Sequence, residues 1–335
     1  MSKITIIGAG MMGSAMSFPA RDNGHEVCLV GIHNRETIDS VNNNRWHPTL
    51  KRFLPEGVKA FHIDGLQEAM AGADLIICGV SSFGVDWFAD NIVPIVPEGV
   101  PVLAITKGMI NGEGGKLIPF PEYMQSRGGR RLSINAVGGP CTSYELADRQ
   151  NTEVAFCGCD METLKKLKAM LQTEYYHVNP TTDVMGLECA VAMKNAYALA
   201  VSLAVGLNEK ANGEGAKPYY NPQAGLFLQS TREAMRMLKL MGGDAESLPY
   251  FTGDLYVTIF GGRTRLIGTL LGRGYSYPEA KEMLAGITLE SVVIAGRAAK
   301  AVRDMHREAE FPLLVHIDDI IRSGAEVAIP WDDFR

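Results

Sequence analysis

The sequence predicts an α/β protein with a mostly parallel sheet in an N-terminal domain, followed by an all-α C-terminal domain. In the first half of the chain, short apolar runs alternate with helical patterns, and a glycine-rich turn follows the first run. After residue 183, strand patterns nearly vanish. Alternating strands and helices imply a parallel sheet with helical crossovers. We therefore expect one domain over residues 1–183 and a helical domain over 184–335.

Composition allows two well-buried cores, because the chain has 335 residues, of which 46% are hydrophobic and 21% charged. The net charge of −6 creates no general positive field, so we expect neither nucleic acid nor an acidic membrane surface as a partner. The chain opens directly into a strand-like run without the layout of a signal peptide, which favours a cytoplasmic location.

The cysteines and histidines do not form a metal-binding pattern. The only closely spaced pair, Cys157 and Cys159, lacks the second pair that a zinc site needs, and the histidines are scattered. We predict no metal site, and we interpret the six cysteines as buried free thiols.

The expected strands are short apolar runs rich in β-branched residues, bounded by turn residues. In order along the chain they are residues 4–10 (ITIIGAG), 26–31 (EVCLVG), 75–80 (LIICGV), 101–106 (PVLAIT), 133–139 (SINAVGG) and 153–158 (EVAFCG).

A glycine motif with the spacing of a dinucleotide fingerprint follows the first strand and opens a helical segment. Gly8 permits the tight turn, Gly10 lets the backbone approach a pyrophosphate, and Gly13 lets the helix pack on the strand. The start of the helix adds unpaired N–H groups and a partial positive charge. A glycine turn without a ligand is the alternative, but this position at the first strand favours a Rossmann-type nucleotide site. Pro19 predicts a kink or an early end of the first helix.

The end of the second strand bears on the choice of dinucleotide. An acidic residue is expected there to bind the ribose 2′-hydroxyl of NAD, and this sequence has none. His33, Asn34 and Arg35 occupy the place and suit a 2′-phosphate, although a plain polar turn is nearly as good an interpretation. We favour NADP(H) over NAD(H), and we disfavour FAD.

The second half contains long helical patterns separated by glycines, and residues 208–220 are expected to form an unusually long loop. The apolar run 187–207 has the length of a membrane span. However, Glu188, Lys194 and Asn195 would be unfavourable in lipid, so we predict a helix buried in protein and no membrane insertion.

Lys194 is the most informative residue of this run. It is either a structural lysine that extends to solvent or pairs with Glu188, or a proton-transfer lysine whose pKa falls through burial. Lys107, at the carboxyl end of the fourth strand, Asp254 and Arg263 are possible companions. Each alone has an ordinary structural interpretation, but together with the glycine motif they favour a catalytic set.

Seven segments, in order and at near-family spacing, resemble the NAD(P)-dependent glycerol-3-phosphate dehydrogenases. They are residues 6–13, 23–31, 105–109, 138–147, 183–200, 230–235 and 253–268. The resemblance covers nearly the whole chain. It implies a Rossmann-type domain, a helical substrate domain, a homodimer, and reversible reduction of dihydroxyacetone phosphate to sn-glycerol 3-phosphate by NAD(P)H.

The resemblance also implies site residues. Lys194 matches the proton-transfer lysine, Lys107 the second lysine near nicotinamide and substrate, and Asp254 the acid that orients them; Glu188 is assigned structural support. The substrate contacts are Gly139, Cys141, Asn195, Gly262, Arg263 and Thr264. The cofactor contacts are Gly8, Gly10, Met11, Met12, Gly13, His33, Asn34, Arg35, Phe83, Lys107, Ser143, Arg263, Leu289 and Glu290. Arg263 suits a phosphate because its planar fork binds two oxygens at once.

Three departures from the family pattern lie on the substrate side. Thr264 replaces the usual Asn, Cys141 replaces Ser or Thr, and the segment 208–220 is longer. They leave open another phosphorylated polyol or ketose, such as a four-carbon one, and a 3-hydroxyacid. A non-catalytic dinucleotide-binding regulator is a further alternative, and retention of Lys107, Lys194, Asp254 and Arg263 argues against it.

Overall fold

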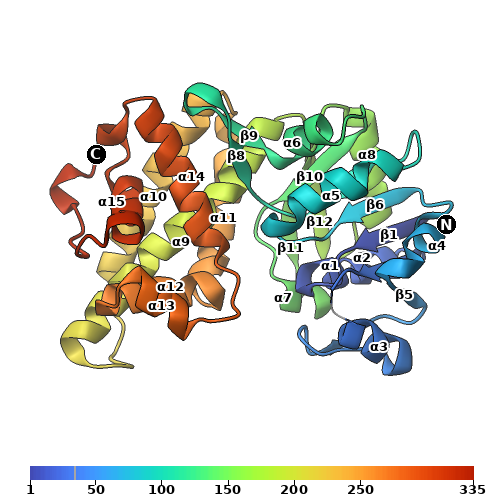
Figure 1. The fold of residues 1–335 in the computed structure, drawn as a ribbon, viewed down its shortest axis with the longest axis horizontal. Coiled ribbons are helices and arrows are strands. Elements are labelled where there is room, and N and C mark those ends of the chain that lie inside the picture. The colour runs from blue at the N-terminus through green and yellow to red at the C-terminus, as the bar shows by residue number, and fades with distance from the viewer. Residues whose placement is uncertain (34) are drawn as a thin grey trace. The chain divides into compact units, whose positions relative to one another are not determined.

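The computed structural model describes residues 1–33 and 35–335, which divide into two units (Figure 1). The first unit comprises Met1–Lys107 and Pro119–Val184, and the second comprises Gly108–Ile118 and Met185–Arg335. The first holds a sheet flanked by helices, and the second consists mainly of helices, so the predicted α/β plus all-α architecture is confirmed.

The sheet of the first unit contains eight strands within the described residues, in the order β12-β11-β10-β7-β6-β1-β2-β5. All neighbouring pairs are parallel except β10 with β11. The strands are β1 (Lys3–Ile7), β2 (Glu26–Gly31), β5 (Val58–His62), β6 (Leu75–Cys78), β7 (Val102–Ala104), β10 (Ile134–Gly138), β11 (Thr152–Cys157) and β12 (Tyr176–Thr181).

Each of the six predicted runs overlaps with one of these strands, whereas β5 and β12 were not identified in the sequence analysis. Both lie at the edges of the sheet. No residue of β5 is buried, and the first four residues of β12 alternate between buried and exposed positions. Central parallel strands are covered on both faces and show continuous apolar runs, but edge strands do not. Pro180 in β12 fits an edge strand, where a missing N–H is tolerated.

Among the residues that the structure describes, eight α-helices of the first unit connect these strands. They are α1 (Met11–Ala15), α2 (Ser17–Asp22), α3 (Arg35–Asn44), α4 (Leu66–Met70), α5 (Val85–Asn91), α6 (Phe120–Arg127), α7 (Ser143–Ala147) and α8 (Met161–Leu171). The short 3₁₀ helices of this unit include η1 (Ile63–Gly65), η2 (Ser82–Gly84) and η3 (Val93–Ile95). In a small hairpin, β3 (Trp46–His47) pairs with β4 (Arg52–Phe53).

The first helix is interrupted at Met16, between α1 and α2. Pro19 lies in the first turn of α2 and has no N–H for the carbonyl of Ala15, four residues earlier. The predicted break is therefore confirmed, and it falls after the glycine turn has been completed.

The second unit contains seven α-helices in the part of the chain that the structure describes. They are α9 (Val184–Asn212), α10 (Tyr220–Met241), α11 (Leu248–Ile259), α12 (Gly262–Arg273), α13 (Tyr277–Met283), α14 (Glu290–Asp304) and α15 (Pro312–Ser323). The 3₁₀ turns are η5 (Ala245–Ser247), η6 (Glu308–Glu310) and η7 (Trp331–Asp333).

The long helix α9 forms the centre of this unit. By length and composition it would suffice to cross a membrane, but 78% of its most apolar window is buried inside the protein. All residues from Gly186 to Met193 and from Ala196 to Gly206 are buried. The prediction of a helix buried in protein is thus confirmed.

A short segment of the N-terminal half belongs to the second unit, which the expected boundary at residue 184 did not anticipate. It forms β8 (Met109–Asn111), η4 (Glu113–Gly115) and β9 (Leu117–Pro119). The Asn111 side chain donates to the carbonyl of Arg297 at 2.8 Å, and Arg297 donates to the carbonyl of Met109 at 2.8 Å. These bonds attach β8 to α14, because a side chain of each element donates to a backbone carbonyl of the other.

The loop expected over 208–220 is shorter than predicted, so that expectation was wrong. Helix α9 continues to Asn212 and α10 begins at Tyr220. Residues 208–212 are polar but compatible with a helix, and the carboxylate of Glu209 pairs with Arg273 of α12 at 2.7 Å. This long-range ion pair extends the helix beyond the point where local composition suggested a loop.

The cysteines are free thiols, but they are not all buried as predicted. Cys28, Cys78, Cys157 and Cys189 are buried, whereas Cys141 is partly exposed and Cys159 is exposed. Burial raises the pKa of Cys78 to about 12, so it stays a protonated, unreactive thiol. Cys159 lies after the end of β11, outside the buried run Val154–Cys157.

Candidate functional site

Five adjacent parallel strands of the first unit bring most of the predicted nucleotide contacts to one edge. Because β10, β7, β6, β1 and β2 run parallel, the segments after them all leave from the carboxyl edge of the sheet. The chain moves outward from β1 through β2 to β5, and then returns to place β6 on the other side of β1. The glycine turn therefore lies at the topological switch point, where open α/β sheets bind ligands.

Two of the three glycines in this turn are required by the fold itself. Gly8 has φ +115°, and a Cβ there would lie 2.5 Å from the backbone of Gly79 at the end of β6. A Cβ on Gly13 would lie 2.1 Å from the carbonyl oxygen of Gly8. These glycines let α1 pack directly on the ends of β1 and β6.

Gly10 is different, because the protein does not need a glycine there for its own packing. It precedes α1 with φ −78° and ψ 176°, which any residue adopts. Apart from its chain neighbours, no described residue has a heavy atom within 4 Å of the position that a Cβ on Gly10 would occupy. The exposed space in front of Gly10 is where a dinucleotide fingerprint admits the pyrophosphate, so this turn fits the cofactor.

His47 supports the same turn, although the sequence analysis did not identify it. Its Nδ1 accepts from the backbone N–H of Leu50 at 3.0 Å, and its Nε2 lies 3.1 Å from the carbonyl oxygen of Ala9. Since Nδ1 accepts, the proton resides on Nε2, which donates to Ala9. Burial lowers the pKa of His47, so a neutral ring holds the turn.

The residues after β2 are partly described. His33 and Arg35 are exposed, and Asn34 lies outside the described residues. The Arg35 guanidinium lies 3.8 Å from the carboxylate of Asp64, which follows β5, and both side chains are exposed to solvent. An acid thus reaches this edge from the neighbouring strand, a feature that inspection of the second strand alone could not reveal.

The segments after β6, β7 and β10 carry further predicted contacts. Phe83 in η2 is 60% exposed, which is unusual for a phenylalanine. The Lys107 Nζ donates to the carbonyl of Gly139 at 3.1 Å. The structure therefore brings the predicted residues Lys107 and Gly139 together. Nearby in the chain, Cys141 is partly exposed, and Ser143 is buried at the start of α7.

The two methionines of the glycine motif lie at the start of α1. Met11 accepts a hydrogen bond from the hydroxyl of Tyr144 on α7 at 3.2 Å, and Met12 is partly buried.

In the second unit, Lys194 of α9 contacts Asp254 of α11. The Lys194 Nζ lies 2.8 Å from Asp254 Oδ1, with side-chain exposures of 13% and 1%. It also donates to the Thr258 hydroxyl at 2.9 Å, and Thr258 donates to the backbone carbonyl of Asp254. The lysine is partly buried and held by a buried carboxylate, whose charge favours the ammonium form.

Thr258 was missed by the sequence analysis. It follows Asp254 by four residues, so both side chains lie on one face of α11. This spacing is the signal that would have identified it. Asn195 is partly exposed beside Lys194. Glu188 is completely buried and lies nearly two turns before them on α9.

The N-terminus of α12 carries the predicted phosphate residues. Gly262 is its first residue, with φ +76°, and Thr264 is buried in its first turn. The Arg263 Nη2 lies 3.4 Å from the Glu290 Oε2 of α14, and 46% of the Arg263 side chain is exposed. Leu289 is the buried N-cap of α14. Because an exposed ion pair contributes at most about 1 kcal/mol, Arg263 remains able to bind an anion.

Backbone packing through glycines holds α12 against α9. A Cβ on Gly268 would lie 2.6 Å from the carbonyl oxygen of Leu199, and a Cβ on Gly272 would lie 2.3 Å from that of Leu203. The small residues allow close approach, as in other small-residue helix contacts. This packing positions the N-terminal turn of α12 relative to the helix that carries Lys194.

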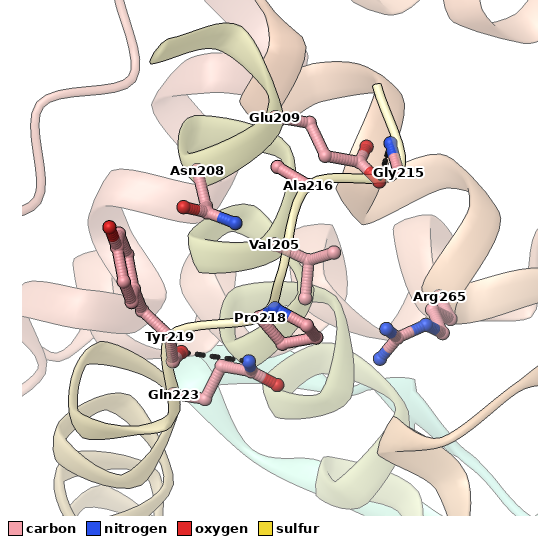
Figure 2. Close-up of a pocket in the computed structure, with 9 residues that line it drawn as sticks. All are labelled: Val205, Asn208, Glu209, Gly215, Ala216, Pro218, Tyr219, Gln223 and Arg265. Carbon is pink, nitrogen blue, oxygen red and sulfur yellow. Dashed lines mark hydrogen bonds between the residues drawn. The ribbon is translucent and has the colours of Figure 1, made fainter. Parts of the chain in front are cut away.

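The second unit contains a pocket of about 230 Å³, bordered by the segment between α9 and α10. Figure 2 shows the residues that line it. Its lining residues are Val205, Asn208, Glu209, Gly215, Ala216, Pro218, Tyr219, Gln223 and Arg265. Gln223 donates to the carbonyl of Tyr219 at 2.9 Å, and Arg265 donates to the carbonyl of Ile259 at 2.6 Å. These bonds hold two sides of the pocket in place.

Comparison with known proteins gives consistent matches over both units. Residues 3–164 match the family model for the N-terminus of NAD-dependent glycerol-3-phosphate dehydrogenase, and residues 183–330 match the model for its C-terminus. The NADP(+)-dependent glycerol-3-phosphate dehydrogenase of Archaeoglobus fulgidus is 32% identical over 328 residues, covering 97% of this chain and 96% of its own.

Two further comparisons agree. The glycerol-3-phosphate dehydrogenase [NAD(P)+] of Shouchella clausii is 28% identical over 323 residues, covering 94% of this chain and 89% of its own. The crystal structure of glycerol-3-phosphate dehydrogenase from Coxiella burnetii superimposes with a TM-score of 0.82 at 23% identity, covering 97% of this chain and 96% of that one. The structural likeness concerns the fold.

Proposed function

Because the chain belongs to the NAD-dependent glycerol-3-phosphate dehydrogenase family, we propose that it interconverts dihydroxyacetone phosphate and sn-glycerol 3-phosphate. It is an oxidoreductase that acts on a CH–OH group with NADP or NAD. The observation that carries the proposed mechanism is the contact of the partly buried Lys194 with the buried Asp254.

We assign nucleotide binding to residues 1–183 and substrate binding and catalysis to residues 184–335. The turn Gly8–Gly13 and the segments after β2, β6, β7 and β10 would hold the dinucleotide. When bound, the nicotinamide supplies or accepts a hydride. The segment after β2 carries two basic residues, His33 and Arg35. The acidic residue Asp64, which follows β5, lies near Arg35. The cations favour a 2′-phosphate and the acid favours a 2′-hydroxyl, so both dinucleotides deserve measurement.

Lys194 is the proposed proton donor and acceptor. Its Nζ gives a proton to the substrate oxygen when the ketone is reduced, and takes it back when the alcohol is oxidised. The Asp254 carboxylate orients the ammonium and stabilises its charge. The Thr258 hydroxyl accepts a hydrogen bond from the same Nζ and so restricts its orientation further. A fixed amine near the reacting oxygen lowers the entropic barrier to proton transfer.

Arg263 is proposed to bind the substrate phosphate. Its guanidinium has a planar fork that can bind two phosphate oxygens, and its ion pair with Glu290 is long, at 3.4 Å, and partly exposed to solvent. The other assigned substrate contacts, Gly139, Cys141, Asn195, Gly262 and Thr264, belong to the same proposal.

A substrate panel tests the proposed reaction. The purified protein is assayed with NADH and with NADPH against dihydroxyacetone phosphate, a four-carbon ketose phosphate, and the oxo form of a 3-hydroxyacid. The last two are included because Thr264 and Cys141 depart from the family pattern. We expect the highest kcat/KM with dihydroxyacetone phosphate. A higher value for another substrate would replace the assignment, and no oxidation of either cofactor with any ketone would favour a non-catalytic regulator.

Lys194→Ala tests the mechanism. Loss of the proton donor should lower kcat by about 10²- to 10⁴-fold. NADPH affinity should change little, since the glycine turn lies in the other unit. Lys239→Ala, at an exposed position of α10, is the control and should behave as wild type. Turnover of Lys194→Ala near that of the control would remove Lys194 from the mechanism.

The homodimer expected from the resemblance is also part of this proposal. Sedimentation equilibrium of the purified protein tests it directly, and a mass of one chain would contradict it.

A further inference from the structure

Two kinds of side-chain contact join α9 to α11 near Lys194. The first is polar and links the Lys194 ammonium to Asp254 and Thr258. The second lies one helical turn away. Tyr197 follows Lys194 by three residues, and Phe251 precedes Asp254 by three residues. Their rings meet edge to face, with centroids 5.9 Å apart and an interplanar angle of 86°. An ionic contact and an aromatic contact therefore stand side by side between the two helices.

The aromatic contact is anchored by a buried carboxylate. The Tyr197 hydroxyl donates to Glu233 Oε2 at 3.0 Å, and both residues are completely buried. Glu233, on α10, also accepts from the Gln229 amide at 2.9 Å and from the backbone N–H groups of Leu313 and Leu314 at 2.8 and 3.0 Å. These N–H groups begin α15, so one carboxylate joins α9, α10 and α15.

The protonation states suit this arrangement. Burial raises the pKa of Tyr197 well above its usual value, so the hydroxyl keeps the proton that it donates. Burial also raises the pKa of Glu233, while the four donors favour the ionised carboxylate. With all four donors satisfied, removing one leaves a buried polar group with one partner fewer.

The ion pair alone cannot determine how α9 lies against α11. A lysine ammonium sits on a flexible four-carbon stem, which follows its partner over several ångströms of helix movement. An aromatic ring packed edge to face and tied by its hydroxyl has two rotatable side-chain bonds and no such freedom. The register of the two helices thus depends on Tyr197 more than on Lys194.

We propose that Tyr197, anchored by Glu233, is a positioning residue that fixes the register of α9 against α11 and thereby holds the Lys194 ammonium on the Asp254 carboxylate. This inference rests on the proposed function of Lys194. Tyr197 acts through Lys194. If the anchor of Tyr197 is removed, the pH dependence of Lys194 should change while the protein still binds the cofactor.

Tyr197→Phe is the main test, because it removes the hydroxyl and keeps the ring against Phe251. The usual net strength of one hydrogen bond sets an upper limit of about tenfold on the expected fall in kcat, and the Kd for NADPH should be unchanged. The ammonium form of Lys194 then loses part of its stabilisation by the Asp254 carboxylate. The alkaline limb of the kcat profile for ketone reduction should therefore move to lower pH.

Tyr176→Phe is the matched control. Tyr176 is also a fully buried tyrosine packed against a phenylalanine, Phe156, at a centroid distance of 6.3 Å, but it lies on β12 in the first unit. It should leave the pH profile unchanged, whatever it does to the melting temperature. Glu233→Gln keeps the size of the side chain and removes the carboxylate, and it should reproduce the shift seen with Tyr197→Phe.

A second readout does not depend on turnover. Competitive acetylation with acetic anhydride, followed by mass spectrometry of the peptide that contains Lys194, gives its reactivity against pH in the full protein. We expect the half-point of Lys194 labelling to move to lower pH in Tyr197→Phe. If the wild-type protein shows no dehydrogenase activity, the proposed function fails, and this labelling still decides the present inference. The same labelling profile and the same kcat profile in Tyr197→Phe as in Tyr176→Phe would overturn it.

Discussion

Replacing Gly10 and Gly13 with alanine, one at a time, should separate cofactor binding from folding within a single turn. The two glycines are three residues apart, yet their surroundings are opposite. An added Cβ at position 13 meets the Gly8 carbonyl oxygen at 2.1 Å. One at position 10 finds no heavy atom within 4 Å among the residues described, apart from its chain neighbours, and the backbone there is ordinary.

The expected magnitudes follow from these distances. Overpacking in a core typically destabilises by about 1–3 kcal/mol, and at Gly13 the opposing atom belongs to backbone that cannot change rotamer, so the upper end applies. With about 2–4 °C per kcal/mol, Gly13→Ala should lower the melting temperature by about 5–10 °C. For Gly10→Ala, the reduced freedom of the unfolded chain and the weaker N-cap nearly cancel, leaving less than about 0.5 kcal/mol.

Cofactor affinity should show the reverse order. A methyl group at Gly10 occupies the approach of the pyrophosphate, and losing one charge-assisted hydrogen bond costs about 1.5–3 kcal/mol. The Kd for NADPH should therefore rise roughly tenfold to 150-fold in Gly10→Ala.

Two measurements on the purified protein check this pair of variants. Thermal unfolding is followed by circular dichroism without nucleotide, and the Kd is obtained by titrating NADPH fluorescence. The reasoning would be refuted if Gly10→Ala bound NADPH with the wild-type Kd, or if Gly13→Ala melted with the wild-type protein.

Two further predictions concern other parts of the structure. Arg263→Ala should raise KM for phosphorylated substrates while a slow unphosphorylated analogue is hardly affected, as measured by steady-state kinetics; equal losses on both would argue against a phosphate contact. Because burial lowers the pKa of His47, the unfolded chain binds its proton first, so the free energy of unfolding should fall as pH drops below about 6.5. His47→Gln should make this fall shallower in urea titrations at pH 7 and 5.5, although His316, whose pKa burial also lowers, keeps part of it. An unchanged fall in the variant would exclude His47 as a contributor.

The central strands and the glycine turn were predictable because their signals are local. Runs such as residues 75–80 are apolar on both faces, and the break before Pro19 follows from the covalent structure of proline. The edge strand β5 was missed because its residues are only half-covered. Residues 208–212 were assigned to a loop because the partner of Glu209, on α12, is distant in sequence.

Local sequence was enough to locate the central strands, the turn that suits a dinucleotide, and the polar residues that stand out in apolar surroundings, since these features depend on neighbours a few positions away. Only the tertiary structure decided that Lys194 meets Asp254, 60 residues later, that Thr258 joins them, and that His47 holds the glycine turn. Such contacts arise from how whole helices and hairpins pack, and packing is determined by the sum of many side-chain volumes, which no short stretch of sequence contains.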